Sequence, residues 1–139
     1  MKRITIITGE RNTGKTFLAK SISLLFNNPV YIDFNNIGYD YEEEFAFSKI
    51  TKKTDLIVID NIYIPLLQYL WNKFSESQIE IKQNCEKTFT MDTPNVILIT
   101  KGAVKSFIKD PSFIRRTDVI LTEVIKNFNR CKYFNFKKI

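Results

Sequence analysis

The chain has no histidine among its 139 residues. This absence excludes imidazole acid–base catalysis, serine–histidine and cysteine–histidine nucleophile pairs, and every zinc site that needs a histidine ligand. Cysteine is almost as rare, since Cys85 and Cys131 lie far apart and form no CxxC motif. The two cysteines predict neither a redox motif nor a metal site, and they favour a reducing intracellular compartment.

Long apolar runs are also missing. No run approaches the roughly 18–20 residues that a membrane-spanning helix needs, and no signal-peptide pattern opens the chain. We therefore expect a cytoplasmic protein. Because 44% of the residues are hydrophobic and 26% are charged, the chain can bury a core, and its length predicts a single domain over residues 1–139.

Acidic residues are absent after Glu123, so the net charge of +6 is unevenly spread. Residues 1–123 carry +1, and the segment 124–139 carries +5. Basic and aromatic side chains are interleaved in that segment: Lys126, Phe128, Arg130, Lys132, Tyr133, Phe134, Phe136, Lys137 and Lys138. Two interpretations stay open. The segment contacts nucleic acid through phosphates and stacking, or it is an edge strand whose lysines discourage aggregation.

The order of apolar patterns predicts an α/β fold. Continuous β-branched runs indicate buried strands, expected at 3–8, 30–34, 56–60, 96–100 and 119–121. Apolar residues at helical spacing lie between them, with helices expected at 15–26, 41–51, 63–74 and 104–109. Two segments of period two, 78–82 and 87–91, predict a β-hairpin. Strands that alternate with helices form a mostly parallel central sheet flanked by helices.

The loop after the first expected strand fits G-x-x-x-x-G-K-[ST], the P-loop pattern, at every fixed position. Its residues are Gly9, Glu10, Arg11, Asn12, Thr13, Gly14, Lys15 and Thr16, followed by Phe17 in the expected helix. Glycines let main-chain N–H groups surround a phosphate, and the helix N-terminus adds positive potential. Lys15 can reach the β- and γ-phosphates, and Thr16 can ligate Mg²⁺. The pattern predicts a site for ATP and Mg²⁺, and a glycine-rich turn without a ligand is the alternative.

Asp60 stands at the end of the strongest strand pattern, LIVID. A carboxylate there can hold Mg²⁺ through water opposite Thr16, as the Walker B aspartate of P-loop enzymes does, and a helix N-cap is the alternative. One expected strand separates the P-loop strand from this one, and a later strand ends in Thr100 and Lys101. This layout is typical of the additional-strand class of P-loop ATPases, whose extra strand carries a sensor beside the γ-phosphate.

Taken in order, these motifs resemble superfamily 3 helicases, the replication ATPases of small DNA and RNA viruses and rolling-circle plasmids. The resemblance rests on the P-loop, the short Walker B strand LIVIDN, the hairpin, the strand VILITK and an arginine pair. The compact spacing is similar to the helicase domain of circular single-stranded DNA virus Rep proteins, over residues 3–121. The resemblance implies an AAA+-like core, a homo-oligomeric ring, usually a hexamer, with ATP held between subunits, and a place in the host-cell cytoplasm.

The resemblance also implies roles for individual residues of the ATP site. Lys15 and Thr16 match Walker A, and Asp60 matches the first Walker B acid. Thr100 or Lys101 falls at the end of the sensor strand. The pair Arg115 and Arg116 is similar to the arginine finger that a neighbouring subunit inserts into the site. A surface contact with phosphate or carboxylate is the alternative for that pair.

The hairpin resembles the one with which the family grips single-stranded nucleic acid in the central pore. Lys82, Lys87 and Phe89 lie near its tip and are the residues expected to contact DNA, or less readily RNA. An exposed hairpin with ordinary lysines is the alternative.

The sequence departs from the family at two positions. Asn61 stands where the family has a second acid, and an amide can orient water but cannot accept its proton. Hydrolysis would then be slow or would use another carboxylate, such as that of Glu10. Lys101 stands where the family favours asparagine.

We therefore expect a Mg²⁺-dependent ATPase and helicase that translocates on single-stranded nucleic acid. Two alternatives stay open, an ATP-binding nucleic-acid or regulatory module with weak hydrolysis and a small P-loop phosphotransferase. The sequence also leaves open whether the chain is a free-standing protein or an excised domain.

Overall fold

The computed structural model describes residues 2–36, 46–82, 88–101, 111–128 and 131–138, with the side chains of 123–128 and 131–135 left out. Their centre is a six-stranded sheet in the order β2-β3-β6-β1-β7-β8. The strands are β1 (Ile4–Gly9), β2 (Pro29–Asp33), β3 (Leu56–Ile62), β6 (Asn95–Thr100), β7 (Thr117–Phe128) and β8 (Cys131–Lys138). A separate antiparallel pair, β4 (Gln78–Ile81) and β5 (Phe89–Asp92), forms the predicted hairpin.

The strand order confirms the predicted class of fold. β6 pairs in parallel with both β1 and β3, so it is inserted between the strand that leads into the P-loop and the strand that carries Asp60. β7 pairs in parallel with β1 on its other side, and β8 returns antiparallel to β7. Parallel strands bring their carboxyl ends to one edge of the sheet, and this edge is where the sequence motifs meet.

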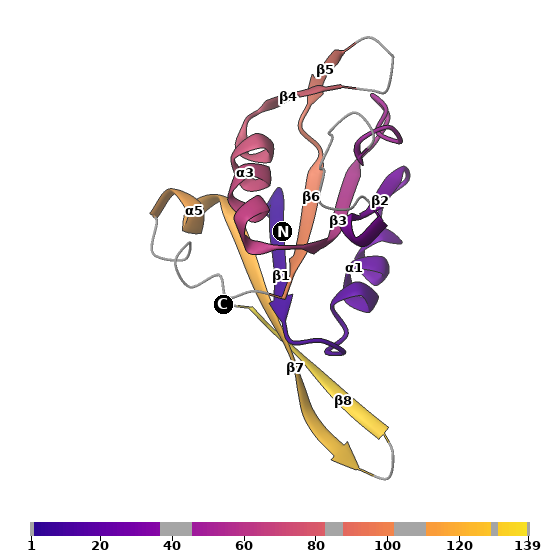
Figure 1. Ribbon diagram of the computed structural model, residues 1–139, viewed down its shortest axis with the longest axis vertical. Helices are drawn as coiled ribbons and strands as arrows, with labels where there is room; N and C mark the ends of the chain where they lie inside the picture. The colour runs from indigo at the N-terminus through magenta and orange to yellow at the C-terminus, as the bar shows by residue number, and fades with distance from the viewer. Residues whose placement is uncertain (1, 37–45, 83–87, 102–110, 129–130, 139) are drawn as a thin grey trace.

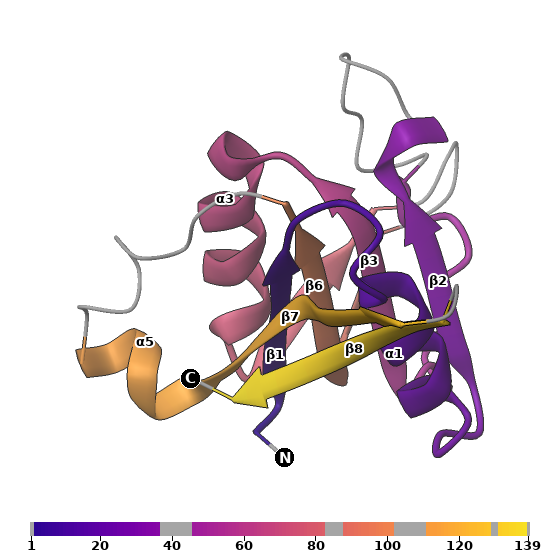
Figure 2. The same cartoon turned by 90° about the horizontal axis from the view of Figure 1, so that it is seen from below.

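Helices lie on both faces of the sheet, as Figure 2 shows for α1 (Lys15–Ser23) and α3 (Ile64–Ser75). Ile7, Ala19 and Ile99 belong to the core under α1. Ile6, Leu70 and Phe74 belong to the larger core under α3, which also includes the inner face of the hairpin. Because β1, β3 and β6 are covered on both sides, they require the unbroken apolar runs from which they were predicted.

Two short helices complete the described part. The 3₁₀ helix η1 (Phe34–Asn36) follows β2, and α5 (Pro111–Arg116) leads into β7. Phe113 of α5 packs on Trp71 of α3 with ring centroids 5.3 Å apart, and the Trp71 indole N–H donates to the Thr117 hydroxyl at 2.7 Å. These contacts fix α5 against the α3 face. No helix among the described residues is both long and apolar enough to cross a bilayer.

Helix α1 is shorter than predicted. It ends at Ser23, and Leu24, Leu25 and Phe26 follow in a turn closed by bonds between residues i and i−3. This tighter turn rotates the chain off the helical period. Leu24 and Leu25 are consequently 85% and 83% exposed, although helical spacing placed Leu25 on the buried face.

The last strands are longer than predicted. β7 has 12 residues where three were expected, and it pairs with β8 along most of its length. Figure 1 shows this pair as a ribbon that extends beyond the rest of the sheet. β8 is an edge strand, which is one of the two interpretations left open for the basic segment. Of the helix expected at 41–51, residues 41–45 lie outside the described residues, Ala46 is helical and 47–49 form a turn, so this helix ends earlier than predicted. The helix expected at 104–109 lies wholly outside the described residues.

Candidate functional site

The P-loop connects the end of β1 to the start of α1, and its backbone path favours glycine at two positions. Gly9 has φ +147°, and a Cβ atom there would lie 2.4 Å from the carbonyl oxygen of Thr122. Gly14 (φ 88°) and Asn12 (φ 58°) occupy the left-handed region that glycine and asparagine tolerate best. The fixed glycines of the motif are thus required by the path of the chain.

The top of the loop is attached to β7. The Thr13 hydroxyl lies 2.8 Å from the Glu10 carbonyl oxygen, to which it donates, and 2.6 Å from the Thr122 hydroxyl oxygen. Because the Thr13 proton is directed to Glu10, the Thr122 hydroxyl is the donor in this 2.6 Å hydrogen bond. Both threonine side chains are buried. The loop is therefore held on two sides, by its own carbonyl groups and by the neighbouring strand.

Lys15 lies inside the loop and is buried. Its ammonium donates to the Gly9 carbonyl oxygen at 2.7 Å and to that of Glu10. Burial, followed by the positive charge of Lys101, lowers the pKa of Lys15, while the carboxylates of Asp60 and Glu10 oppose the shift. A partly desolvated cation surrounded by main-chain groups is suited to bind a phosphate oxygen.

Asp60 lies in β3 and faces the start of α1. Its Oδ2 accepts hydrogen bonds from the Thr16 hydroxyl at 2.7 Å and the Tyr31 hydroxyl at 2.5 Å. Its Oδ1 accepts the main-chain N–H of Asn61 at 2.8 Å. Asp60 is buried, so these three donors replace the water that its charge would otherwise need. The predicted pairing of Thr16 with Asp60 is present in the structure.

β3 does not end at Asp60, as the pattern predicted, but continues to Ile62. The register with β6 shifts between Ile59 and Ile62, and Asn61 has φ 59°. This bulge turns the Asn61 side chain toward β2, where its Nδ2 donates to Asp33 Oδ1 at 2.7 Å. Bulges of this kind re-aim a side chain beside a functional site.

The structure distinguishes the two residues proposed for the sensor position. The Thr100 hydroxyl is buried and donates to the carbonyl oxygen of Ile62 at 2.8 Å, so it is part of the sheet. Lys101, the next residue, is exposed and lines the same pocket as Lys15.

That pocket has a volume of about 380 Å³, within the range of roughly 300–1,000 Å³ that is usual for small-ligand sites. It is lined by Arg11, Asn12, Thr13, Gly14, Lys15, Thr16, Phe17, Asp60, Asn61 and Lys101. Gly9 and Glu10 contribute the carbonyl groups that hold Lys15 and Thr13. Ten of the residues predicted for the nucleotide and its catalysis therefore line one pocket.

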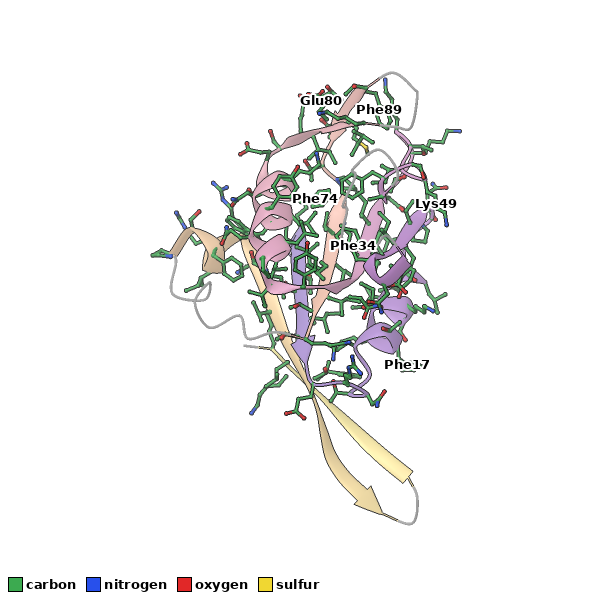
Figure 3. All side chains as sticks on the ribbon, in the orientation of Figure 1. Phe17, Phe34, Lys49, Phe74, Glu80 and Phe89 are labelled. Carbon is green, nitrogen blue, oxygen red and sulfur yellow. The ribbon has the colours of Figure 1, made fainter. Side chains whose placement is uncertain are left out.

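The arginine pair and the hairpin residues lie elsewhere. Arg115 and Arg116 end α5, are exposed, and do not line the pocket of their own chain. Lys82 is exposed, whereas Phe89 is partly buried and packs against the core under α3. Lys87 lies outside the described residues. Phe17 beside the P-loop and Phe89 of the hairpin lie far apart along the long axis of the molecule (Figure 3).

Three residues of the site were not predicted: Tyr31, Asp33 and Thr122. Tyr31 and Asp33 are two residues apart on β2, and Asp33 is the register partner of Asp60. Burial, followed by the hydrogen bond and the charge of Asp60, raises the pKa of Tyr31, so the phenol stays a donor. The alternation of Tyr31 and Asp33 in a strand beside Asp60 is the signal that could have indicated them.

Comparison with protein families identifies this arrangement. The family model described as AAA domain matches residues 1–85, from β1 through the P-loop and Asp60 to the hairpin. This chain belongs to the AAA domain family. No significant match was found among curated proteins. Lys101, the arginine pair and the β7–β8 ribbon lie beyond the residues that the family model matches. This match therefore carries no information about them.

Solved structures share the fold of this AAA domain. The apo structure of the NrS-1 C-terminal region matches 85% of this chain with a TM-score of 0.56 and 16% identity. A structure of JCV helicase with a small molecule bound matches 85% of this chain with a TM-score of 0.55 and 12% identity. The chain spans only 28% and 34% of those two structures. The predicted resemblance is therefore confirmed at the level of a P-loop, helicase-like fold.

The residues present fit Mg²⁺ together with a nucleotide. The hydroxyl of Thr16 and the carboxylate of Asp60 are oxygen ligands, which Mg²⁺ prefers, and they meet at 2.7 Å beside Lys15. Among the described residues there is no cluster of three or more acidic or cysteine side chains that could enclose a metal alone. Mg²⁺ is usually held in this way, by one or two protein oxygens, water and substrate phosphates.

Proposed function

We propose that this AAA domain is an ATP-binding, Mg²⁺-dependent ATPase of the superfamily 3 helicase type. In this proposal it translocates on single-stranded nucleic acid, DNA in preference to RNA, as a homo-oligomeric ring of six copies. One observation carries the proposal: Lys15, Thr16 and Asp60 meet in a single pocket at the carboxyl edge of the sheet. This edge is where open α/β sheets bind their ligands.

Each residue of the pocket has a defined task in phosphoryl transfer. Lys15 exchanges the carbonyl groups of Gly9 and Glu10 for phosphate oxygens, and the loop N–H groups bind the rest of the phosphate chain. Thr16 and Asp60 would hold Mg²⁺, which would supply positive charge beside the phosphates. Lys101 adds a cation near the γ-phosphate, where negative charge grows in the transition state.

A complete site in this proposal needs a second copy of the chain. Arg115 and Arg116 are exposed at the end of α5, on a different part of the surface from the pocket. An arginine finger must reach the γ-phosphate. In a head-to-tail ring, either arginine would enter the pocket of the next copy, because such an interface joins two different surfaces of the same chain.

Nucleic acid would contact the opposite end of the molecule. Lys82 follows β4 and is exposed, and Lys87 is separated from β5 by one residue in the sequence. Lysine side chains there can bind phosphates without regard to base sequence, as translocation requires. Phe89 is a weaker candidate for base stacking because it already packs against the core.

An ATP-binding module with weak hydrolysis is the second candidate function. The observation that favours it is Asn61, whose amide is bound to Asp33 and cannot accept a proton from water. Such a module would bind Mg-ATP as a conformational ligand and release it largely unhydrolysed.

The first test is the substitution Lys15→Ala. It removes the cation that faces the phosphates, so we expect loss of Mg-ATP binding, by roughly 100-fold or more in Kd. Lys53→Ala, at an exposed lysine away from the pocket, is the matched control and should leave binding unchanged. Isothermal titration calorimetry would measure both, and equal affinities for the wild type and Lys15→Ala would refute the proposal.

The second test measures ATP turnover with and without single-stranded DNA. Stimulation by DNA supports the helicase, and tight binding of ATP without turnover supports the module. Transfer of phosphate to a metabolite, at a rate indifferent to DNA, would identify a phosphotransferase. Single-stranded RNA in a parallel assay decides the preferred nucleic acid.

A further inference from the structure

We propose that Asp33 is a positioning residue that fixes the amide of Asn61, so that the carbonyl oxygen of that amide faces the nucleotide pocket. This inference rests on the proposed ATPase function and concerns the orientation of the attacking water. It assigns a catalytic task to β2, which carries no residue of the P-loop or Walker B motifs.

The backbone brings the two side chains together. β2 pairs in parallel with β3, and Asp33 is opposite Asp60 in the register. The bulge after Ile59 gives Asn61 its φ of 59° and directs its side chain sideways, to Asp33. Without the bulge, Asn61 would follow the strand alternation and point to the other face of the sheet.

The carboxylate of Asp33 is itself held in place. Its Oδ1 accepts the main-chain N–H of Asn35 at 2.9 Å, where the chain turns into η1, and the Nδ2 of Asn61 at 2.7 Å. One fixed acceptor thus defines the direction of the Asn61 NH₂ group. Since the two ends of an amide point apart, the carbonyl Oδ1 is directed away from Asp33.

The lining of the nucleotide pocket agrees with this direction. Asn61 lines it together with Asp60 and Lys101, and Asp33 is not among the lining residues. A carbonyl oxygen can accept a hydrogen bond from water and leave a water lone pair free to attack phosphorus. An NH₂ group in the same place would bind that lone pair, which is the wrong polarity for attack.

The same contact explains why a carboxylate at position 61 would fail in this chain. Asn61→Asp alone would place two carboxylates where a donor and an acceptor now lie 2.7 Å apart. Like charges at that distance repel and displace the side chain from the pocket. The exchange of both residues, Asp33→Asn with Asn61→Asp, restores one donor and one acceptor and presents a carboxylate to the water.

A double-mutant cycle without nucleotide or Mg²⁺ tests the contact. We expect Asp33→Asn and Asn61→Asp each to lower Tm by several degrees, and the combined exchange to return Tm to within about 2 °C of the wild type. Asp92→Asn, in the distant β5, is the matched control and should be additive with Asn61→Asp. Additive Tm changes in the Asp33–Asn61 cycle would overturn the proposal.

Steady-state hydrolysis tests the catalytic task. Relative to the combined exchange, we expect Asn61→Asp alone to lower kcat by roughly 10- to 100-fold, with Kd for Mg-ATP changed less than about twofold. Equal kcat values for these two variants would overturn the proposal. Loss of Mg-ATP binding by the wild-type protein would instead refute the ATPase, a result that calorimetry reports separately from this comparison.

Discussion

Asp60 shows how one side chain takes its properties from its neighbours. Its Oδ2 accepts two hydroxyl groups, one from the P-loop helix and one from the edge strand β2. In the proposed site, Thr16 would give up part of this bond to Mg²⁺, whereas the Tyr31 phenol could retain its own. The Lys20 ammonium lies 5.1 Å from the centre of the Tyr31 ring. We therefore expect Tyr31 to keep the carboxylate oriented when Mg²⁺ is bound.

The substitution Tyr31→Phe tests this role. It removes one hydrogen bond to a carboxylate, which is worth roughly 1.5–3 kcal/mol, so we expect the Mg²⁺ concentration for half-maximal ATP turnover to rise by about 10-fold or more. Tyr63→Phe, at a half-exposed tyrosine, is the matched control and should not change this value. A Mg²⁺ titration measures it, and identical curves for Tyr31→Phe and the wild type would contradict the role.

Position 9 shows why the contact between β1 and β7 matters for the P-loop. Gly9 is paired with Thr122 in the register, and the loop turns back over β7 through Thr13. The two strands approach so closely that neither a methyl group nor a normal φ angle fits at residue 9. The strand next to β1 thus determines the shape of the loop as much as the loop sequence does.

We expect Gly9→Ala to lower the free energy of unfolding by about 1–3 kcal/mol, because the new Cβ would overlap the Thr122 carbonyl oxygen. It should also weaken Mg-ATP binding, since the strand and the loop must move apart to relieve the overlap. Leu24→Ala, at an 85% exposed leucine, is the control and should change stability by less than about 0.5 kcal/mol. Urea unfolding measures both, and an unchanged midpoint for Gly9→Ala would show that the loop is less constrained than its geometry indicates.

The whole molecule separates its functional parts by position. The nucleotide pocket lies at the carboxyl edge of the parallel strands, and the hairpin lies beyond their amino ends (Figure 1). α3 and β6 connect the two ends, since α3 runs back from the Asp60 strand to the hairpin and β6 returns to Lys101. In the proposed ATPase, these two elements, which pack on each other, would be the route by which a change at the γ-phosphate reaches the hairpin.

A mixing experiment tests whether copies share a site. Lys15→Ala keeps its arginines, and the double variant Arg115→Ala/Arg116→Ala keeps its P-loop. Each should be inactive alone, but a 1:1 mixture should recover activity, because about a quarter of head-to-tail interfaces then combine an intact loop with intact arginines. ATP turnover measures the recovery, with the mass in solution under Mg-ATP as the control for assembly. Full activity of the arginine variant alone would exclude the shared site.

The sequence by itself determined the class of fold and the centre of the site. Unbroken apolar runs are possible only for strands covered on both faces, and the P-loop pattern fixes a local backbone path that few other residues allow. For this reason Lys15, Thr16 and Asp60 could be predicted to meet. The early end of α1 and the greater length of β7 could not be predicted from the sequence. A tightened turn and the pairing of an edge strand depend on weak local preferences.

Only the tertiary structure decided which residues support that centre. These residues are joined by contacts between segments that are far apart in the sequence. They are the bulge at Asn61, the donor from Tyr31, the acceptor from Asp33 and the contact of Thr13 with Thr122. Such contacts are set by sheet order and register, which no local pattern encodes. The same reason explains why Thr100 and Lys101, adjacent in sequence, divide into a sheet contact and a pocket residue.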